Sequence, residues 1–458
     1  MADFPELVRR TAERVAEYRA GVGERPVAPA VDREALRGAL GGPLPAEGAD
    51  ADRVLDQLTT AIEPVLMASV GPRYFGFVVG GALDAATCAD MLTTGWDQMA
   101  FNSTSAPAAS IVEEIVGDWL KEALGLPVDA SFGIVTGAQG ANNVGLAAAR
   151  HRVLARAGWD VEAHGLSGAP PVRVVANEER HATVDRALRL LGIGADALEP
   201  VAADGNGAVD PDALARALEG GDPESPTIVC VQAGNVNTGA CDDLAAAAEL
   251  AQRHGAWLHM DGAFGLWAAA SPSKRHLVDG LERADSWAID GHKWLNVPYD
   301  TGFVLCSDKT ANAASMSYTA SYLVGQGEGA PSDYVPESSR RARGFAAWAA
   351  LRELGGDGLA EVVDRCCALA RRFAEQLSEV EGVEIGNEVV LNQALAGFGS
   401  DDRTDRVIAA VQRDGTCWMG GTTWHGRRYM RISVSNWSTT EDDVDRSVAA
   451  IRRAYAET

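Results

Sequence analysis

The sequence predicts an α/β protein built on a mostly parallel sheet, and two patterns support this prediction. From about residue 110, short β-rich apolar runs alternate with helical segments of roughly 10 to 15 residues, which is typical of parallel strands covered on both faces by helices. From about residue 344, a long helical segment precedes short strands and a final helix. This second pattern predicts a smaller C-terminal α+β domain.

Three regions follow in order along the chain. Residues 1–68 are helical stretches joined by Gly/Pro/Ala-rich sequence, too thin for a core of their own, so we expect an arm that docks on another surface. Residues 69–343 form the large domain, and residues 344–458 form the small domain. The strands expected in the large domain lie in the runs FGIVTG, RVVAN, TIVCVQAG, WLHMDGAFG, WAIDGHKW and GFVLCSD.

Composition excludes several classes of protein. The 458 residues include 40 basic and 64 acidic side chains, a net charge of −24, which disfavours nucleic acid and anionic membranes as partners. Seven scattered cysteines without a CxxC pair predict neither a zinc site nor a disulfide framework, and no metal is expected. Because the chain lacks a leader-like segment and an apolar run long enough to span a bilayer, we expect a cytoplasmic protein.

Two residues at the ends of expected strands suggest chemistry. Asp261 follows the strand WLHM, and Lys293 follows the strand WAI, with His292 beside it. Ligands of parallel sheets bind at the carboxyl ends of the strands. A partly desolvated lysine can attack an aldehyde, and an aspartate can pair with a pyridine nitrogen, so together they fit pyridoxal phosphate (PLP). A structural ion pair would explain the same two residues.

The turn TGAQGANN, residues 136–143, is a candidate phosphate site. It follows a strand and opens a helix, where backbone amides can bind a phosphate. The candidates are Gly137, Ala138, Gln139 and Asn142. An ordinary strand–helix connection without a ligand would show the same sequence pattern. The turn matches neither the dinucleotide fingerprint nor the P-loop, which disfavours NAD and ATP.

Other strand-end residues have two interpretations each. His181 begins a helix, where its imidazole could stack on a flat ring and exchange protons or simply cap the helix. Asn235 and Thr238 lie in a turn, where they could bond a cofactor edge or stabilise the turn itself. Arg340, Arg341 and Arg343 are expected to pair with acidic neighbours.

In chain order, the motifs TGAQGAN, RHATV, GNVNTG, HMDGAFG and DGHKW resemble the group II pyridoxal-dependent decarboxylases, which include aromatic amino acid and glutamate decarboxylases. The resemblance covers residues 71–437 and is greatest to a bacterial branch. It implies a fold type I PLP enzyme that works as a homodimer, with its active site at the subunit boundary.

The resemblance also implies residue roles. Lys293 would hold PLP as a Schiff base, and Asp261 would pair with the pyridine nitrogen and stabilise the quinonoid that follows loss of carbon dioxide. His181 and Ala263 would pack on the two ring faces. The remaining residues expected to bind the cofactor are Gly137, Ala138, Gln139, Asn235 and His292.

Substrate contacts are implied by position in the family, at Phe77, Val79 and Phe101, with Phe101 reaching into the neighbouring subunit's pocket. Tyr334 takes the place of a tyrosine on a mobile loop, spanning 321–344, that returns a proton to the carbanion. Arg431 would clamp the substrate carboxylate, or else form an ion pair between domains, the interpretation we favour from sequence.

The sequence therefore predicts a PLP-dependent carboxy-lyase of amino acid metabolism that converts an L-amino acid into an amine and carbon dioxide. The mostly apolar pocket candidates favour an aromatic or aliphatic substrate over an acidic one. The alternatives with the same cofactor are oxidative deamination to an aldehyde, aldehyde-lyase cleavage and transamination. A scaffold without turnover is disfavoured because Lys293 and Asp261 are both present.

Overall fold

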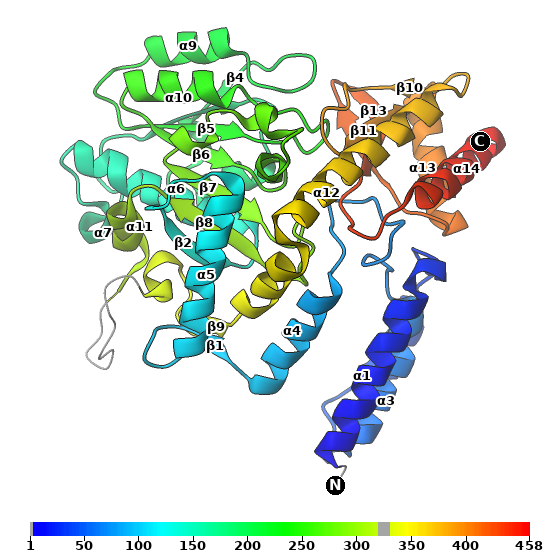
Figure 1. The fold of residues 1–458 in the computed structure, drawn as a ribbon. Coiled ribbons are helices and arrows are strands. Elements are labelled where there is room, and N and C mark those ends of the chain that lie inside the picture. The colour runs from blue at the N-terminus through cyan, green and yellow to red at the C-terminus, as the bar shows by residue number, and fades with distance from the viewer. Residues whose placement is uncertain (1–2, 319–329) are drawn as a thin grey trace.

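The computed structural model describes residues 3–318 and 330–458 (Figure 1). The N-terminal arm projects from the body of the molecule and contains three helices, α1 (Phe4–Gly21), α2 (Arg33–Leu40) and α3 (Ala51–Ile62). Helices α1 and α3 lie side by side, joined by an ion pair of 3.1 Å between Arg10 and Asp56. None of the three helices buries a side chain, and Val8 and Leu58 are exposed apolar residues on them. The arm therefore carries apolar surface that its own chain does not cover.

The central sheet has seven strands in the order β2-β8-β7-β6-β5-β3-β4. Only β8 runs antiparallel to its neighbours, so the prediction of a mostly parallel sheet is confirmed. Strand β4 was not among the expected strands. Its sequence LEPV contains a proline, which cannot donate to a ladder, and it lies at the edge, pairing with β3 alone. The strands are β2 (Ser131–Val135), β3 (Arg173–Asn177), β4 (Leu198–Val201), β5 (Thr227–Gln232), β6 (Trp257–Asp261), β7 (Ser286–Asp290) and β8 (Gly302–Cys306).

Helices cover both faces of this sheet and define two hydrophobic cores. Strand side chains alternate between the cores: Val174 and Ile228 belong to one, and Val175 and Val229 to the other. This alternation explains why each strand reads as a continuous apolar run. The first face is covered by α6 (Ala138–Arg156), α7 (Val161–His164), α8 (Ala182–Leu190) and α11 (Lys309–Met316), and the second by α5 (Pro107–Leu124), α9 (Pro211–Glu219) and α10 (Leu244–Arg253).

The C-terminal region forms a four-stranded antiparallel sheet in the order β10-β11-β13-β12, packed against helices. Its strands are β10 (Glu384–Ile385), β11 (Gln393–Gly397), β12 (Gly420–Trp424) and β13 (Arg427–Ser433), and its helices are α13 (Asp401–Asp414) and α14 (Glu441–Glu457). Within the described ranges, no helix is long and apolar enough to cross a membrane.

The long helix α12 (Gly344–Ser378) connects the two regions (Figure 1). It breaks at Gly355, whose φ of 61° is costly for residues other than glycine. The part before the break packs near α4 (Asp84–Trp96) and α5, and the part after it packs on β11 and α14. The boundary expected at residue 344 thus lies at the start of this shared helix.

A buried ion pair anchors the segment that leads into α12. Strand β9 (Arg340–Arg341) pairs with β1 (Met99–Ala100), and Arg340 donates two hydrogen bonds of 2.6 Å to Glu113 on α5. The two side chains are only 2% and 3% exposed. Arg341 pairs with Asp90 and Arg343 with Asp300, so the expectation that all three arginines meet acidic partners is confirmed.

Replacing Glu113 by alanine is expected to destabilise the fold by about 3–5 kcal/mol, because it leaves the Arg340 guanidinium buried without a counter-charge. Denaturant unfolding measures this change. The matched control is Asp90→Ala, which opens the more exposed Arg341 pair and should cost about 1 kcal/mol or less. Equal losses in the two variants would contradict the argument from burial.

Candidate active site

A cavity of about 360 Å³ lies at the carboxyl ends of the sheet strands. Its walls come from the turns after β2, β3, β5, β6 and β7, together with one residue that precedes α4. The lining residues are Phe77, Thr136, Gly137, Ala138, Gln139, His181, Thr183, Gln232, Gly234, Val236, Asp261, Ala263, Phe264, Asp290, His292 and Lys293. Residues from across the large domain thus meet at the edge where ligands of such sheets bind.

Lys293 reaches the cavity from the turn after β7. Its Nζ lies 2.8 Å from Oδ2 of Asp290 and 5.9 Å from the ring centre of Phe264. The backbone of the turn is tightly enclosed, since a Cβ placed on Gly80 would lie 1.9 Å from the Lys293 carbonyl oxygen. The backbone of Lys293 can therefore pack this closely on residue 80 only because residue 80 is a glycine.

Asp261 ends β6, the strand beside β7, and is 7% exposed. Oδ2 accepts hydrogen bonds from Asn142 at 3.1 Å and from Thr183 at 3.3 Å, and Oδ1 accepts one from the Ala263 amide at 3.2 Å. Three hydrogen-bond donors thus converge on one carboxylate. The group is thereby suited to pair with a cationic ring nitrogen.

The start of α6 forms another wall of the cavity. Its first amide, at Ala138, donates to Asp290. A Cβ on Gly302 would lie 2.5 Å from the Gly137 backbone, and one on Gly137 would lie 2.9 Å from the His292 ring, so the glycines keep this corner open. Gln139 lines the cavity, but its amide nitrogen donates to Asn143 and to the Thr183 carbonyl.

Two histidines face the cavity, and burial lowers the pKa of both. His181 caps α8: the Thr183 amide donates to its Nδ1, and the Thr183 hydroxyl lies 2.8 Å from that nitrogen. The residue therefore combines the two roles considered from sequence, since it caps a helix and also lines the cavity. His292 accepts a hydrogen bond from the Thr301 amide and stacks on Tyr299 at 4.3 Å.

The structure does not bring every expected residue to the cavity of its own chain. Asn235 is fully buried, and its side chain holds the turn by accepting from Asn237 and donating to the Glu179 carbonyl. Val79 is half-buried and is not among the residues that line the cavity. Arg431 is not among the lining residues, but it donates at 3.2 Å to the carbonyl oxygen of Val236, which is one of them.

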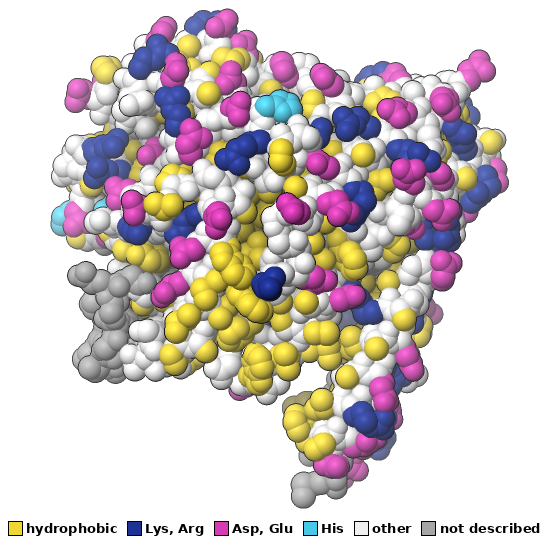
Figure 2. All heavy atoms as spheres, viewed as in Figure 1, with side chains coloured by type: hydrophobic (Ala, Val, Ile, Leu, Met, Phe, Trp, Pro, Cys, Tyr) yellow, Lys and Arg dark blue, Asp and Glu magenta, His cyan; other side chains and the backbone are white. Residues whose placement is uncertain are grey.

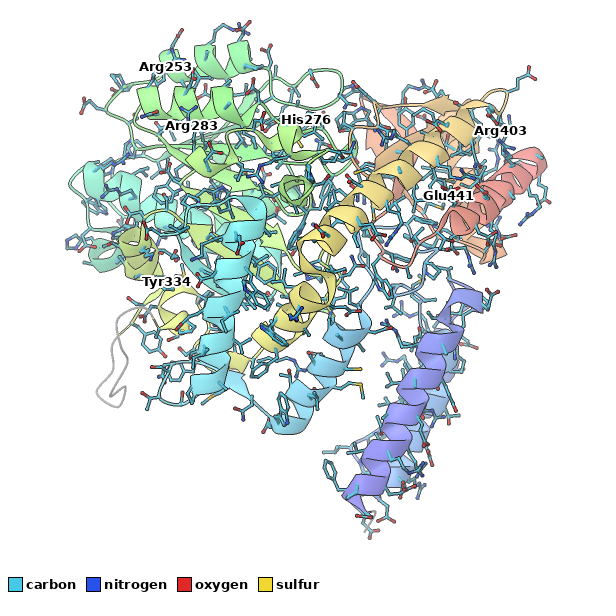
Figure 3. The ribbon with its side chains drawn as sticks, in the orientation of Figure 1. Arg253, His276, Arg283, Tyr334, Arg403 and Glu441 are labelled. Carbon is cyan, nitrogen blue, oxygen red and sulfur yellow. The ribbon has the colours of Figure 1, made fainter. Side chains whose placement is uncertain are left out.

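The segments of Phe101 and Tyr334 meet elsewhere in the large domain, where the Ser332 amide donates to the Phe101 carbonyl. Figure 3 shows the place of Tyr334. The backbone carbonyl of Tyr334 accepts from Asn312 on α11. Neither side chain lines the cavity of its own chain. Residues 321–329 of the expected loop lie outside the described residues.

Sequence reasoning missed several lining residues. Asp290 was overlooked although it stands three residues before Lys293, a spacing that signals proximity. Thr183 was signalled by its place two residues after His181. The others lie within strand-end segments that the sequence analysis quoted, but no role was assigned to their side chains; they are Thr136, Gln232, Gly234, Val236 and Phe264.

This site defines a class of protein. A parallel sheet that presents a lysine and an aspartate at neighbouring strand ends, beside a helix N-terminus, is the arrangement of a PLP-dependent enzyme. Residues 36–395 match the family described as the pyridoxal-dependent decarboxylase conserved domain, and the chain belongs to that family. The protein is a fold type I enzyme that decarboxylates an L-amino acid, and PLP is its cofactor.

The similarity to known decarboxylases extends over nearly the whole chain. Tryptophan decarboxylase 1 of Oryza sativa subsp. japonica is 25% identical over 99% of this chain and 94% of its own length. Cysteine sulfinic acid decarboxylase of Rattus norvegicus is 28% identical over 92% of this chain and 89% of its own length. The crystal structure of Oryza sativa TDC with PLP and tryptamine has a TM-score of 0.92 at 24% identity, covering 99% of this chain and 98% of that one.

Replacing Gly80 by alanine is expected to displace the Lys293 turn and to lower the fraction of enzyme that holds PLP covalently, because the added Cβ would lie 1.9 Å from the lysine carbonyl oxygen. Borohydride reduction followed by peptide mapping measures this fraction. The control is Gly38→Ala on α2, where nothing lies within 4 Å of the new Cβ. Full labelling of Gly80→Ala at Lys293 would show that the close approach does not position the lysine.

Proposed function

We propose that this enzyme decarboxylates an aromatic L-amino acid to its amine, with PLP bound covalently to Lys293. The observation that carries the proposal is that Lys293 and Asp261, on neighbouring strand ends, face a single cavity with Phe77 in its wall. The similarity to two tryptophan decarboxylases, 25% and 27% identical, supports the substrate class.

Each residue of the cavity takes a role that its contacts support. Bound PLP supplies a protonated ring that accepts the electron pair released from Cα as carbon dioxide departs. The Asp261 carboxylate holds the proton at the ring nitrogen. His181 and Ala263 would flank the ring of bound PLP, and the turn at Gly137 that opens α6 would hold the phosphate together with His292, Gln139 and Thr136.

Arg431 is proposed to bind the substrate carboxylate. From sequence, an ion pair between domains was the favoured explanation, but the structure gives Arg431 the Val236 carbonyl as its hydrogen-bond acceptor. None of the ion pairs between described residues includes Arg431. Among the described residues, the guanidinium has only this neutral oxygen as acceptor, so its charge stays available for a carboxylate bound beside Val236.

The wall that faces the substrate side chain is aromatic. Phe77 has a φ of 55°, and its ring stacks on Trp418 of the small domain at 5.4 Å. Trp418 in turn stacks on Tyr74 at 5.1 Å, so the phenyl ring is supported from behind. Among the described lining residues, Lys293 is the only lysine or arginine, which disfavours a substrate with an acidic side chain.

A second candidate outcome is oxidative production of an aldehyde. Phenylacetaldehyde synthase of Arabidopsis thaliana is 26% identical over 94% of this chain, and a 4-hydroxyphenylacetaldehyde synthase of Rhodiola rosea is 28% identical. In this outcome, molecular oxygen would take up two electrons and two protons to become hydrogen peroxide, and hydrolysis would release the aldehyde and ammonia. Protonation by the tyrosine that we assign as Tyr334 would favour the amine instead.

We also propose that the enzyme is a homodimer whose active sites lie at the subunit boundary. Phe101 and Tyr334 do not reach their own cavity, which suits a role in that of a second copy. Apolar side chains gather on the face formed by α4, α5 and α12 (Figure 2). The exposed residues there are Met91, Leu92, Trp96, Ile111 and Trp348, and a second subunit would cover such a patch.

Two finer points stay predictions. The sequence motifs favour a bacterial branch of the family, whereas the curated relatives described above come from plants and a rat. The cytoplasmic location expected from the sequence likewise stays a prediction.

The proposed reaction is tested by supplying PLP-loaded enzyme with a panel of L-amino acids and measuring carbon dioxide, amine, aldehyde and hydrogen peroxide. We expect carbon dioxide and amine in equal amounts from an aromatic substrate, and neither from Lys293→Ala, which should also lose borohydride labelling. Aldehyde with peroxide would establish the second candidate. Turnover of aspartate or glutamate in preference to aromatic substrates would contradict the proposed substrate class.

The proposed dimer predicts complementation between two inactive variants. Lys293→Ala lacks the lysine of its own active site. Phe101→Ala lacks the side chain that would line the active-site cavity of its partner. When the variants are unfolded together and refolded, mixed dimers should regain one intact site, giving about a quarter of wild-type activity for random pairing. Light scattering gives the mass. A monomer, or no recovery in a verified mixed dimer, would contradict a shared site.

A further inference from the structure

Behind Asp261 lies a chain of buried polar side chains that the roles proposed above do not use. Asn142 on α6 donates to Asp261, and its Oδ1 lies 2.9 Å from Nε2 of His259 on β6. Nδ1 of His259 lies 2.8 Å from the hydroxyl of Ser286 on β7, which accepts from the indole of Trp257 at 2.9 Å. All four side chains are no more than 2% exposed.

The donor and acceptor of each hydrogen bond between Asp261 and Trp257 can be assigned. The Asn142 amide nitrogen donates to Asp261 and to the Thr183 hydroxyl, both at 3.1 Å, so Asn142 Oδ1 must be the acceptor for His259. His259 therefore carries its proton on Nε2, and Nδ1 accepts from the Ser286 hydroxyl. Burial lowers the pKa of His259 to about 4, which leaves the ring neutral with a single proton at neutral pH.

This direction matters because an asparagine amide has two orientations. If the Asn142 amide were flipped, its oxygen would face the Asp261 carboxylate and its NH₂ would face the His259 N–H. Both contacts would repel, and in a buried site each would leave unpaired polar groups. A neutral His259 protonated on Nε2 thus fixes the orientation in which Asn142 donates to Asp261.

The imidazole of His259 packs closely against α6. A Cβ on Gly145 of α6 would lie 2.8 Å from Cε1 and 2.9 Å from Nδ1 of His259. The helix therefore approaches the ring as closely as a glycine allows. This close packing holds the imidazole in the plane that joins Ser286 to Asn142.

We propose that His259 is a positioning residue for the cofactor: through Asn142 it keeps Asp261 an ionised acceptor, so that the proton stays on the pyridine nitrogen of PLP. The inference rests on the proposed role of Asp261. A hydrogen-bond donor to a carboxylate favours its ionised form. Losing that donor would let the proton move from the ring towards Asp261 and would weaken the ring as an electron acceptor.

The test uses holoenzyme loaded with PLP that is ¹⁵N-labelled in the ring, observed by ¹⁵N NMR at neutral pH. The wild-type signal should be that of a protonated pyridine. In His259→Leu it should move towards the unprotonated position, and turnover should fall by at least about tenfold. His259→Gln, which retains an N–H donor for Asn142, should restore the wild-type signal.

The matched control is Asn392→Leu, which removes a buried asparagine of the small domain that bonds Val434 and Ser435. It should lower stability without moving the ring signal. An unchanged ring signal in His259→Leu with PLP still bound would overturn the proposal, and so would an equal movement in Asn392→Leu.

A measurement on the wild-type protein alone covers the case in which His259→Leu does not fold. The histidine ¹⁵N spectrum should show His259 neutral and protonated on Nε2, and a proton on Nδ1 would overturn the assigned direction. The proposed function is judged separately: if borohydride fixes no PLP to Lys293 of the wild type, that function fails, while the histidine spectrum still decides how Asn142 is oriented.

Discussion

The parallel pairing of β6 with β7 is the constraint on which the active site depends. Asp261 is the last residue of β6 and lies opposite Ala288 of β7, so the turn that follows β7 brings Lys293 to the same edge. Both strands are buried throughout, and their ladder hydrogen bonds leave little freedom in register. A shift of one residue would turn Asp261 to the other face of the sheet.

Burial of polar groups gives the site its rigidity. Asp261 and Asn142 are buried, and each finds hydrogen-bond partners within the protein. Satisfying them requires a single arrangement that runs from Asp261 through Asn142 and His259 to the indole of Trp257. The carboxylate that we assign to the cofactor ring is thereby held by groups that never meet the substrate.

Other parts of the polypeptide have no partner within their own subunit, and this contrast supports the proposed dimer. The arm of α1, α2 and α3 buries none of its side chains, and apolar residues stay exposed on α4, α5 and α12. Phe101 and Tyr334 stand together but away from their own cavity. A second subunit would cover the apolar surface, and its own cavity would lie beside these two residues.

The sequence by itself determined the sheet, its alternation with helices, and the lysine and aspartate at strand ends, because apolar runs and strand-end polar residues are local signals. It also placed His181 and the start of α6 correctly at the cavity wall. Only the tertiary structure decided that Asn235 stabilises its turn, that Arg431 bonds a backbone carbonyl, and that His259 lies behind Asp261. These contacts join residues far apart in the chain, and a side chain's partner depends on which elements pack beside it.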